Sequence, residues 1–267
     1  MKIKAIVSDF DGTVVSYEQT ISVEVKAAIS DYVAQGGIFS IATGRAYEGL
    51  LENMCQEIKL KTPQIVRGGA EIISSETGEV IWGKYIPIND VKAILDRLLP
   101  LNDFILLAES GKDLFTKEGQ SDPEFATGAN IRDIKELPLN AVPKIAIPPL
   151  YDAQQIELEP LLQTLINEFP QLHIVKTTGK KGFGMDINDG SAGKKSALIA
   201  YAEMMRIDLQ DIMGIGDSFN DLPLLDACGV KVAMGNAPTE LREVADFIVG
   251  TQAEDGVIEA IQKALAS

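Results

Sequence analysis

The stretch IKAIVSDFDGT, residues 3–13, decides the predicted fold and also carries the first chemical signal. Its apolar first half predicts a short buried strand, and Gly12 allows the chain to turn sharply after it. Ligands of open α/β sheets bind at the carboxyl ends of the strands, where Asp9 and Asp11 stand. One carboxylate can act as a nucleophile and the other as a general acid. We therefore interpret this pair as catalytic rather than as an ordinary Asp- and Gly-rich turn.

Alternating strand and helix patterns extend outward from this first strand. Ser22 predicts the N-cap of a helix whose apolar residues recur at helical spacing until Gly36, and residues 38–42 predict a second strand. Strand, helix and strand in succession imply a parallel sheet with right-handed crossovers. The far end of the chain repeats the pattern, with predicted strands at 212–215, 230–233 and 247–249.

The middle of the chain lacks this strict alternation. Residues 71–74 and 79–85 flank a turn and predict a hairpin, whereas residues 117–143 predict a long loop. Other strands and helices are expected near 91–98, 104–108, 113–116, 144–147, 153–168, 172–176 and 183–187. Strands and helices mixed in this way are typical of an α+β domain.

We therefore predict an α/β fold in two parts. Residues 1–83 and 186–267 are expected to form a catalytic core with a parallel sheet. Residues 84–185 are expected to form an inserted α+β cap domain. The two halves of the core must come together to build one sheet.

Two further motifs could contact a phosphate group. ATGR, residues 42–45, offers a hydroxyl and backbone N–H groups where a helix is expected to begin, although Thr43 could equally be a plain N-cap. GKKSAL, residues 193–198, places a lysine at the start of a helix, where it could neutralise a phosphate or simply be solvated. This second motif is not a P-loop, because Lys195 stands where that motif requires Ser or Thr.

The last motif, GDSFND at residues 216–221, places two acids and an amide after a short apolar strand. Hard oxygen ligands of this kind suit Mg²⁺. A dinucleotide-binding fingerprint is excluded, because Phe219 occupies its third glycine position. An acidic helix start stabilised by the helix dipole is the structural alternative. The four motifs together supply a nucleophile pair, a hydroxyl, a lysine and an acidic cluster, which make a coherent site.

The composition narrows the possible partners. A net charge of −15 argues against non-specific binding to nucleic acid or to an anionic membrane, and no apolar run approaches membrane-spanning length. Cys55 and Cys228 are far apart, so we expect reduced thiols and a cytoplasmic location. The only histidine, His173, lies in an alternating apolar stretch, which argues against a catalytic Ser–His or Cys–His pair.

In their order along the chain, these motifs resemble the four motifs of the haloacid dehalogenase superfamily. The resemblance is carried by DFDGT at 9–13, ATGR at 42–45, KKSAL at 194–198 and GDSFND at 216–221. The details resemble the Cof-type phosphatases, which insert a large α/β cap between the second and third motifs. This resemblance implies a Rossmann-like core and Mg²⁺-dependent release of phosphate from a small metabolite, such as a sugar phosphate, through an aspartyl-phosphate.

The resemblance also implies a role for each residue of the site. Asp9 corresponds to the nucleophile and Asp11 to the general acid and base. Thr43 and Lys194 correspond to the pair that binds the phosphoryl group. The expected Mg²⁺ ligands are Asp9, Asp217 and the backbone carbonyl of Asp11, with Asp221 in support. The remaining expected phosphate contacts are Phe10, Gly44 and Asn220.

Two positions depart from the family pattern. Lys195 replaces the glycine that usually follows the motif lysine. RGGA at residues 67–70 replaces the Asn-Gly-Ala that often follows the third strand, so a polar contact near the cap hinge is expected to be either missing or replaced by Arg67.

An acid two residues after the nucleophile favours reactions whose leaving group needs a proton. This argues for a phosphatase or a phosphomutase over a dehalogenase or an ion-pumping ATPase. A phosphomutase is the main enzymatic alternative. A non-catalytic sensor of phosphorylated metabolites is the alternative outside enzymes, and loss of Asp9, Asp11 or Asp217 would be its signature. All three acids are present.

Overall fold

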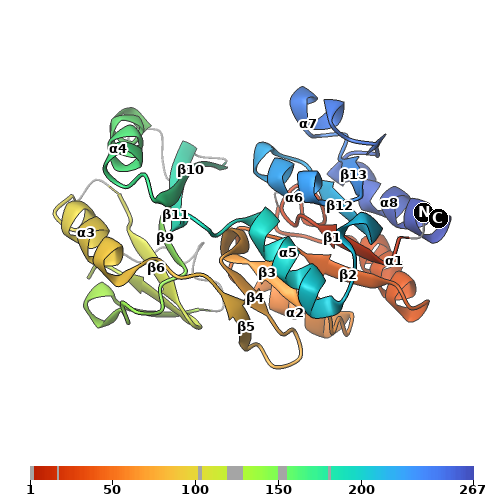
Figure 1. Ribbon diagram of the computed structural model, residues 1–267, viewed down its shortest axis with the longest axis horizontal. Helices are drawn as coiled ribbons and strands as arrows, with labels where there is room; N and C mark the ends of the chain where they lie inside the picture. The colour runs from red at the N-terminus through yellow and green to blue at the C-terminus, as the bar shows by residue number, and fades with distance from the viewer. Residues whose placement is uncertain (1–2, 17, 102–103, 119–128, 150–154, 180–181) are drawn as a thin grey trace. The chain divides into compact units, whose positions relative to one another are not determined.

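The computed structural model describes residues 3–16, 18–101, 104–118, 129–149, 155–179 and 182–267 (Figure 1). The chain divides into two compact units. Unit 1 comprises Met1–Trp82 and Gly193–Ser267, and unit 2 comprises Gly83–Ala192. Unit 1 contains a parallel sheet and unit 2 a largely antiparallel one, which confirms the predicted α/β fold class.

Unit 1 is built on a parallel sheet in the order β14-β13-β12-β1-β2. Its strands are β1 (Ala5–Ser8), β2 (Ile38–Ile41), β12 (Ile212–Gly216), β13 (Val230–Ala233) and β14 (Phe247–Ile248). β1 lies between β12 and β2, with Ser8 opposite Ile215 on one side and Ile41 on the other. The residues that follow these three strands therefore emerge at the same edge of the sheet.

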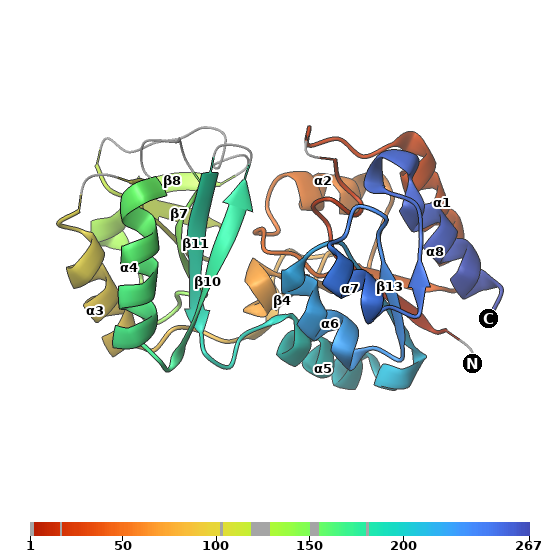
Figure 2. The same ribbon diagram turned by 90° about the horizontal axis from the view of Figure 1, so that it is seen from above.

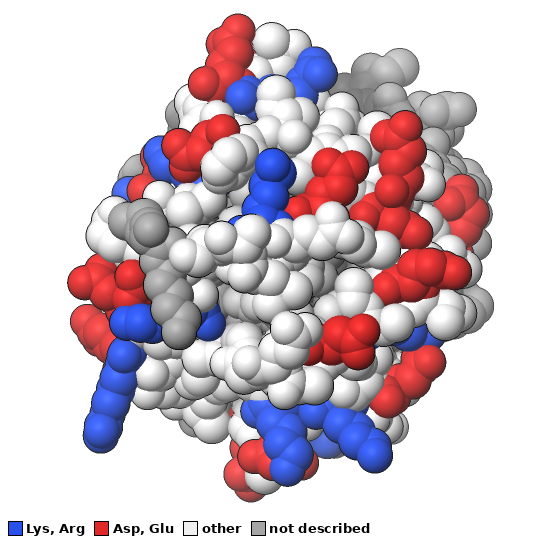
Figure 3. Space-filling model, turned by 90° about the vertical axis from the view of Figure 1, so that its right-hand side faces the viewer, with Lys and Arg blue, Asp and Glu red and all other residues white. Residues whose placement is uncertain are grey.

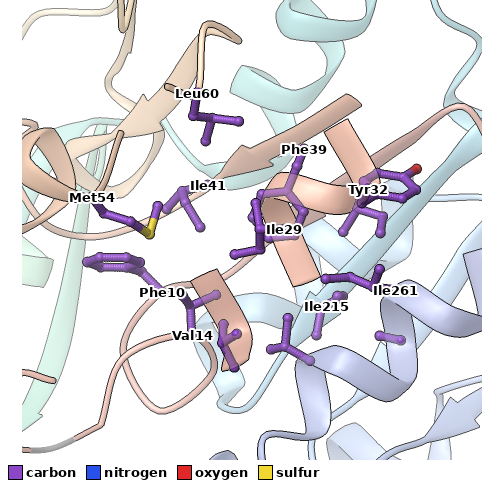
Figure 4. Close-up of a cluster of buried hydrophobic side chains, with 14 of the residues drawn as sticks. Phe10, Val14, Ile29, Tyr32, Phe39, Ile41, Met54, Leu60, Ile215 and Ile261 are labelled. Atoms are coloured by element: carbon purple, nitrogen blue, oxygen red, sulfur yellow. The ribbon is translucent and has the colours of Figure 1, made fainter. Parts of the chain in front are cut away.

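Helices cover both faces of this sheet (Figures 1 and 2). α1 (Val23–Ala34) and α8 (Gly256–Leu265) lie on one face, and α5 (Lys194–Met205) and α6 (Leu222–Ala227) lie on the other. Side chains of β1 alternate between the two faces of the sheet. Ile6 packs into the apolar cluster beside α1 and α8, and Val7 packs into the apolar cluster beside α5. Figure 4 shows the apolar cluster beside α1 and α8, in which Ile29 of α1 and Ile261 of α8 approach Ile215 of the sheet.

Local signals explain several helix boundaries in unit 1. Ser22 is the N-cap of α1, as predicted, and its hydroxyl accepts a hydrogen bond from the Val25 N–H. Three further helical segments are α2 (Leu50–Glu57), α7 (Thr239–Glu243) and the 3₁₀ turn η5 (Phe219–Asp221). The predicted hairpin is also present, as β4 (Glu71–Ile73) and β5 (Val80–Gly83) are neighbours in a small sheet with β3 (Gln64–Val66).

Unit 2 is a six-stranded sheet with two helices on one face (Figure 2). The strand order is β10-β11-β9-β6-β7-β8, and all neighbours are antiparallel except β7 and β8. The elements are α3 (Ile88–Leu98), β6 (Leu107–Ser110), β7 (Asp113–Thr116), β8 (Asn130–Asp133), η2 (Ile134–Glu136), β9 (Lys144–Ile147), α4 (Gln155–Glu168), β10 (Leu172–Gly179) and β11 (Gly182–Asp189). Val91, Ile94, Leu95 and Leu98 all turn into its core, as the helical spacing indicates.

Two sequence expectations for this unit differ from the structure. The long loop expected over 117–143 contains β8 and η2, because β8 pairs with β7 and extends the sheet. Residues 119–128 of that loop, and the expected helix start at 153–154, lie outside the described residues. The expected boundary at 185/186 falls inside β11, whose pairing with β9 and β10 keeps the whole strand in unit 2.

The chain has more acidic than basic residues, with a net charge of −15. Figure 3 shows acidic and basic side chains interspersed over one face of the molecule. Among the described residues, no helix has both the length and the apolar character that crossing a bilayer requires.

Candidate active site

Three buried carboxylates meet where β1 and β12 end. Asp9 follows β1, and its N–H donates to the Ile215 carbonyl at 2.8 Å, which fixes the start of this loop against β12. One oxygen from each of Asp9, Asp217 and Asp221 lies within 4.8 Å of the others, and all three residues are buried. The backbone of Gly12 packs closely against this cluster, because a Cβ at Gly12 would lie 2.3 Å from an Asp217 oxygen. Gly12 also has a φ of 80°, so both the lack of space for a Cβ and the backbone conformation favour glycine at this position.

Lys194 brings a positive charge into this cluster. It is the first residue of α5, its side chain is 4% exposed, and its Nζ donates to Oδ1 of Asp9 and Oδ1 of Asp221, each at 2.5 Å. The next residue, Lys195, is exposed. The structure thus brings the first lysine of the motif, and not the second, to the predicted nucleophile.

Asp221 links the lysine to the loop that carries Asp217. Its Oδ2 accepts hydrogen bonds from the N–H groups of Asp217 and Ser218, both at 3.0 Å, while its Oδ1 faces Lys194. The carboxylate therefore caps the turn η5, which is the structural alternative considered for this motif, and contacts the charged cluster as well. The structural alternative therefore applies to Asp221, and the role of the motif in binding Mg²⁺ stays a prediction.

The electrostatics of the cluster favour an added cation. Burial raises the pKa of Asp9 well above its usual range, and the neighbouring Asp221 adds to the effect although Lys194 opposes it. Burial, with Asp221 again contributing, raises the pKa of Asp217 to about 7. Burial alone would lower the pKa of Lys194, but the attraction of Asp221 and Asp9 raises it overall. Three buried carboxylates share one ammonium group, so this donor set fits a hard divalent metal ion.

Asp11 has a different environment from Asp9. Its carboxylate is 42% exposed and forms an ion pair with Arg45, whose Nε and Nη2 both donate to it. The guanidinium also lies 5.9 Å from the centre of the Phe10 ring. Arg45 is part of the second motif, but no role was predicted for it from the sequence. The sequence feature that could have indicated a role is that Arg45 follows one predicted strand while Asp11 follows the neighbouring one.

The second motif is buried but does not open a helix. Thr43 is fully buried, and its hydroxyl accepts a hydrogen bond from the Arg45 N–H at 3.1 Å. α2 begins only at Leu50, so the expected helix start within 42–45 is wrong. The physical reason is that the carbonyls of Thr43 and Arg45 accept hydrogen bonds from the turn after β3, which holds this segment outside a helix.

The other expected phosphate contacts differ in how they are placed. Phe10 is fully buried with its ring in the apolar core, so its side chain is not placed to contact a phosphate (Figure 4). Beside Gly44 there is open space, since an added Cβ would meet nothing within 4 Å. Asn220 is exposed, and its side-chain carbonyl accepts a hydrogen bond from the Ser218 hydroxyl at 2.6 Å.

Asn236 is a site residue that was not predicted from the sequence. Its Nδ2 donates to Oδ2 of Asp217 at 3.1 Å and to the Gly12 carbonyl at 2.9 Å, and its Oδ1 accepts from the Gln252 N–H. It thereby ties the loop after β13 to the first and fourth motifs. The signal was its place three residues after a predicted strand, at the same edge of the sheet.

Comparisons with known proteins show the family to which the chain belongs. A family model described as haloacid dehalogenase-like hydrolase matches residues 6–261. The 5-amino-6-(5-phospho-D-ribitylamino)uracil phosphatase of Bacillus subtilis is 28% identical over 260 residues, which cover 97% of this chain and 95% of that protein.

Solved structures extend the likeness to the fold. A haloacid dehalogenase-like hydrolase from Bacteroides thetaiotaomicron superimposes with a TM-score of 0.84 at 25% identity, covering 98% of this chain and 99% of that one. A phosphatase of the same superfamily and organism gives a TM-score of 0.75 at 26% identity, covering 100% and 96%. The family model spans nearly the whole chain and includes all four motifs, and the predicted superfamily is thereby confirmed. This chain belongs to the haloacid dehalogenase-like hydrolases.

Proposed function

We propose that this chain is a Mg²⁺-dependent phosphatase that hydrolyses a phosphate monoester of a small metabolite through an aspartyl-phosphate on Asp9. The observation that carries the proposal is the buried cluster in which Lys194 bridges Asp9 and Asp221 beside Asp217. A nucleophilic carboxylate, an ammonium group and a set of hard oxygen ligands are the parts that phosphoryl transfer requires.

In the first half-reaction, an Asp9 oxygen attacks phosphorus and the bond from phosphorus to the ester oxygen breaks. The departing alkoxide takes a proton from Asp11 and leaves as an alcohol. In the second half-reaction, water attacks the phosphorus of the aspartyl-phosphate and gives a proton to Asp11. Inorganic phosphate is released, and the Asp9 carboxylate is restored.

The remaining groups act by position and charge. Thr43 and Lys194 are proposed to hold the non-bridging oxygens, so the charge that develops on them is stabilised. Asp9, Asp217 and the Asp11 carbonyl are the proposed Mg²⁺ ligands, with Asp221 in support. Bound Mg²⁺ would neutralise the phosphoryl group and orient it. We propose that unit 1 supplies this chemistry as the catalytic core and that unit 2 acts as the cap.

The substrate class follows from the leaving group and from the relatives. An acid placed to protonate the leaving group is needed most for an alkyl phosphate, whose alkoxide is a poor leaving group. The B. subtilis relative is named for a substrate with a phosphorylated ribityl chain. We therefore propose phosphorylated sugars and polyols as the first compounds to test.

The test is phosphate release from a panel of such monoesters and from 4-nitrophenyl phosphate, with Mg²⁺ and with a chelator. Asp9→Asn, purified in the same way, is the matched control for contaminating host phosphatase, because the amide is nearly isosteric but a far poorer nucleophile. Release that needs both Asp9 and Mg²⁺ supports the proposal. Equal release by the two proteins would remove Asp9 from its role, and formation of an isomer without free phosphate would favour the phosphomutase.

A further inference from the structure

The turn that follows β3 has an unusual backbone. Arg67, Gly68 and Gly69 all have positive φ angles, of 53°, 72° and 92°. Residues with a side chain rarely adopt this region, so Arg67 needs surrounding contacts to hold it there. Figure 1 shows β3 and β4, which this turn joins, next to α5.

One side of the turn binds the second motif. The Gly68 N–H donates to the Thr43 carbonyl at 2.9 Å, and the Arg67 N–H donates to the Arg45 carbonyl at 2.7 Å. Both carbonyls belong to the segment that carries the buried Thr43 hydroxyl. The position of this segment therefore depends on the conformation of the turn.

The other side of the turn packs against the start of α5. A Cβ at Gly69 would lie 2.2 Å from the carbonyl carbon of Gly193 and 2.6 Å from the backbone nitrogen of Lys194. Real Cβ atoms do not approach backbone this closely, so a methyl group here must displace one of the two segments. The backbone of Gly69 thus touches the peptide bond that leads into Lys194.

A buried ion network braces the turn. Arg67 is 2% exposed, and its Nη1 lies 2.7 Å from Glu71 while its Nη2 lies 3.1 Å from Glu48. Glu71 stands in β4, and Glu48 stands in the segment between the second motif and α2. One guanidinium therefore ties the turn to its own hairpin and to the segment after Arg45.

We propose that the turn at residues 67–69 is a positioning element that sets the separation between Thr43 and Lys194. The inference rests on the proposed function, in which these two residues hold the phosphoryl group. Gly69 provides the contact with Lys194, Gly68 provides the contact with Thr43, and Arg67 keeps the turn in its strained conformation. None of the three residues needs to touch the substrate.

The test is Gly69→Ala, with Gly36→Ala as the matched control. Gly36 has a φ of 89° but open space around it, so its substitution brings the same backbone strain without the clash. We expect Gly69→Ala to lower kcat/KM for 4-nitrophenyl phosphate by about 10- to 100-fold, since a displacement near 1 Å can cost that much. Gly36→Ala should stay within about twofold of the wild type.

Two further measurements separate positioning from a general loss of structure. In a crystal structure of Gly69→Ala, the distance between the Thr43 hydroxyl oxygen and the Lys194 Nζ should differ from that in the wild type. In the Lys194→Met background, Gly69→Ala should have little further effect on kcat/KM, because the separation of Thr43 and Lys194 no longer matters once the ammonium group is gone. Losses that multiply in the double variant, or an unchanged distance between Thr43 and Lys194, would overturn the inference.

If Gly69→Ala does not fold, Arg67→Lys replaces it. Lysine keeps the charge but lacks the planar fork of arginine, so it cannot reproduce the geometry in which Nη1 faces Glu71 and Nη2 faces Glu48. The same change in the distance between Thr43 and Lys194 is expected, with kcat/KM lowered several-fold, and an unchanged distance would overturn the inference. A wild type without phosphatase activity would contradict the proposed function alone, because the distance between Thr43 and Lys194 is measured independently of turnover.

Discussion

Arg45 holds the Asp11 carboxylate through two nitrogens, with Nε 2.8 Å from Oδ2 and Nη2 2.5 Å from Oδ1. The two residues are 34 positions apart in the chain and meet because β1 and β2 are neighbours in the sheet. A bidentate contact of this kind fixes the direction of a carboxylate as well as its charge. The proposed acid and base is thus oriented by a residue of the second motif.

Arg45→Met should lower kcat by about tenfold, with a smaller change in KM. The expected loss is part of the rate enhancement that a correctly oriented general acid and base provides. Methionine is an unbranched side chain without the guanidinium, so it removes both the ion pair with Asp11 and the contact of the guanidinium with the Phe10 ring. The check is a double-mutant cycle on an alkyl phosphate, in which Arg45→Met should cost much less in the Asp11→Asn background. Arg97→Met, at a half-exposed arginine of α3, is the control. The same fold loss in both backgrounds would mean that Arg45 does not act through Asp11.

Asp217→Asn should raise the Mg²⁺ concentration needed for half-maximal activity by about tenfold or more, because one hard, charged ligand is lost. Calorimetric titration of Mg²⁺ into the variant provides a readout that does not depend on turnover. Asp226→Asn is the matched control, since Asp226 is an exposed acid on α6. Unchanged Mg²⁺ binding by Asp217→Asn would remove this residue from the proposed ligands.

The strand ends were predictable from the sequence, but the contacts between them were not. Short apolar runs followed by polar residues placed Asp9 and Asp217 correctly at the edge of one sheet, because a parallel sheet brings such ends together. The partner of Asp11 depends on side-chain directions across two strands, which spacing along the chain does not give. Asn236 was missed for the same reason, since its contacts to Gly12 and Asp217 join segments far apart in the chain.

Predictions for unit 2 were weaker for a related reason. Apolar patterns marked β9 at its observed bounds and the buried face of α3, because both pack directly into a core. β8 carries mostly exposed side chains, so no alternation of apolar residues marks it, and its pairing with β7 makes it a strand. Edge strands of this kind are defined by their neighbours rather than by their own composition.

Lys194→Met should lower kcat/KM by about 100-fold or more, whereas Lys195→Met should change it by less than about twofold, because only the first lysine contacts the buried carboxylates. The two lysines are adjacent, so each variant serves as the control for the other. Inhibition by inorganic phosphate checks the binding role, and it should weaken only in Lys194→Met. A larger loss in Lys195→Met would show that the motif is shifted by one residue.

The two cysteines should react slowly with a thiol reagent at pH 8 in the folded protein. Burial raises the pKa of Cys55 and of Cys228 to about 12, and the thiolate is the reactive form. Both pKa values are raised by folding, so any stability that the neutral thiols contribute is present below about pH 9 and is lost as the pH rises towards 12. Labelling should accelerate in denaturant in parallel with unfolding. Rapid labelling of either thiol without denaturant would contradict its burial.

Asp11→Asn is expected to affect the two half-reactions differently for different substrates. An alkyl phosphate needs a proton on its leaving group, so formation of the phosphoenzyme should fall steeply, by about 10²- to 10⁴-fold. A nitrophenyl phosphate has an acidic phenol as its leaving group, so its first step should fall only mildly. The second step needs a base to deprotonate water whatever the first substrate was, so it should be slow in both cases.

The aryl substrate should therefore trap the intermediate in Asp11→Asn. Rapid mixing should give a burst of nitrophenol, of about one equivalent per active site, followed by slow turnover. Labelled phosphate recovered on Asp9 after quenching would locate the covalent bond, and the double variant with Asp9→Asn is the control, which should show no burst. The amide that Asp11→Asn introduces can still accept a hydrogen bond from Arg45, so a change in fold does not explain these results. Equal rate losses on both substrates, with no trapped intermediate, would leave Asp11 only a structural role. A group that acts as acid and base must affect phosphoenzyme formation differently for the two substrates and must slow hydrolysis of the phosphoenzyme equally for both.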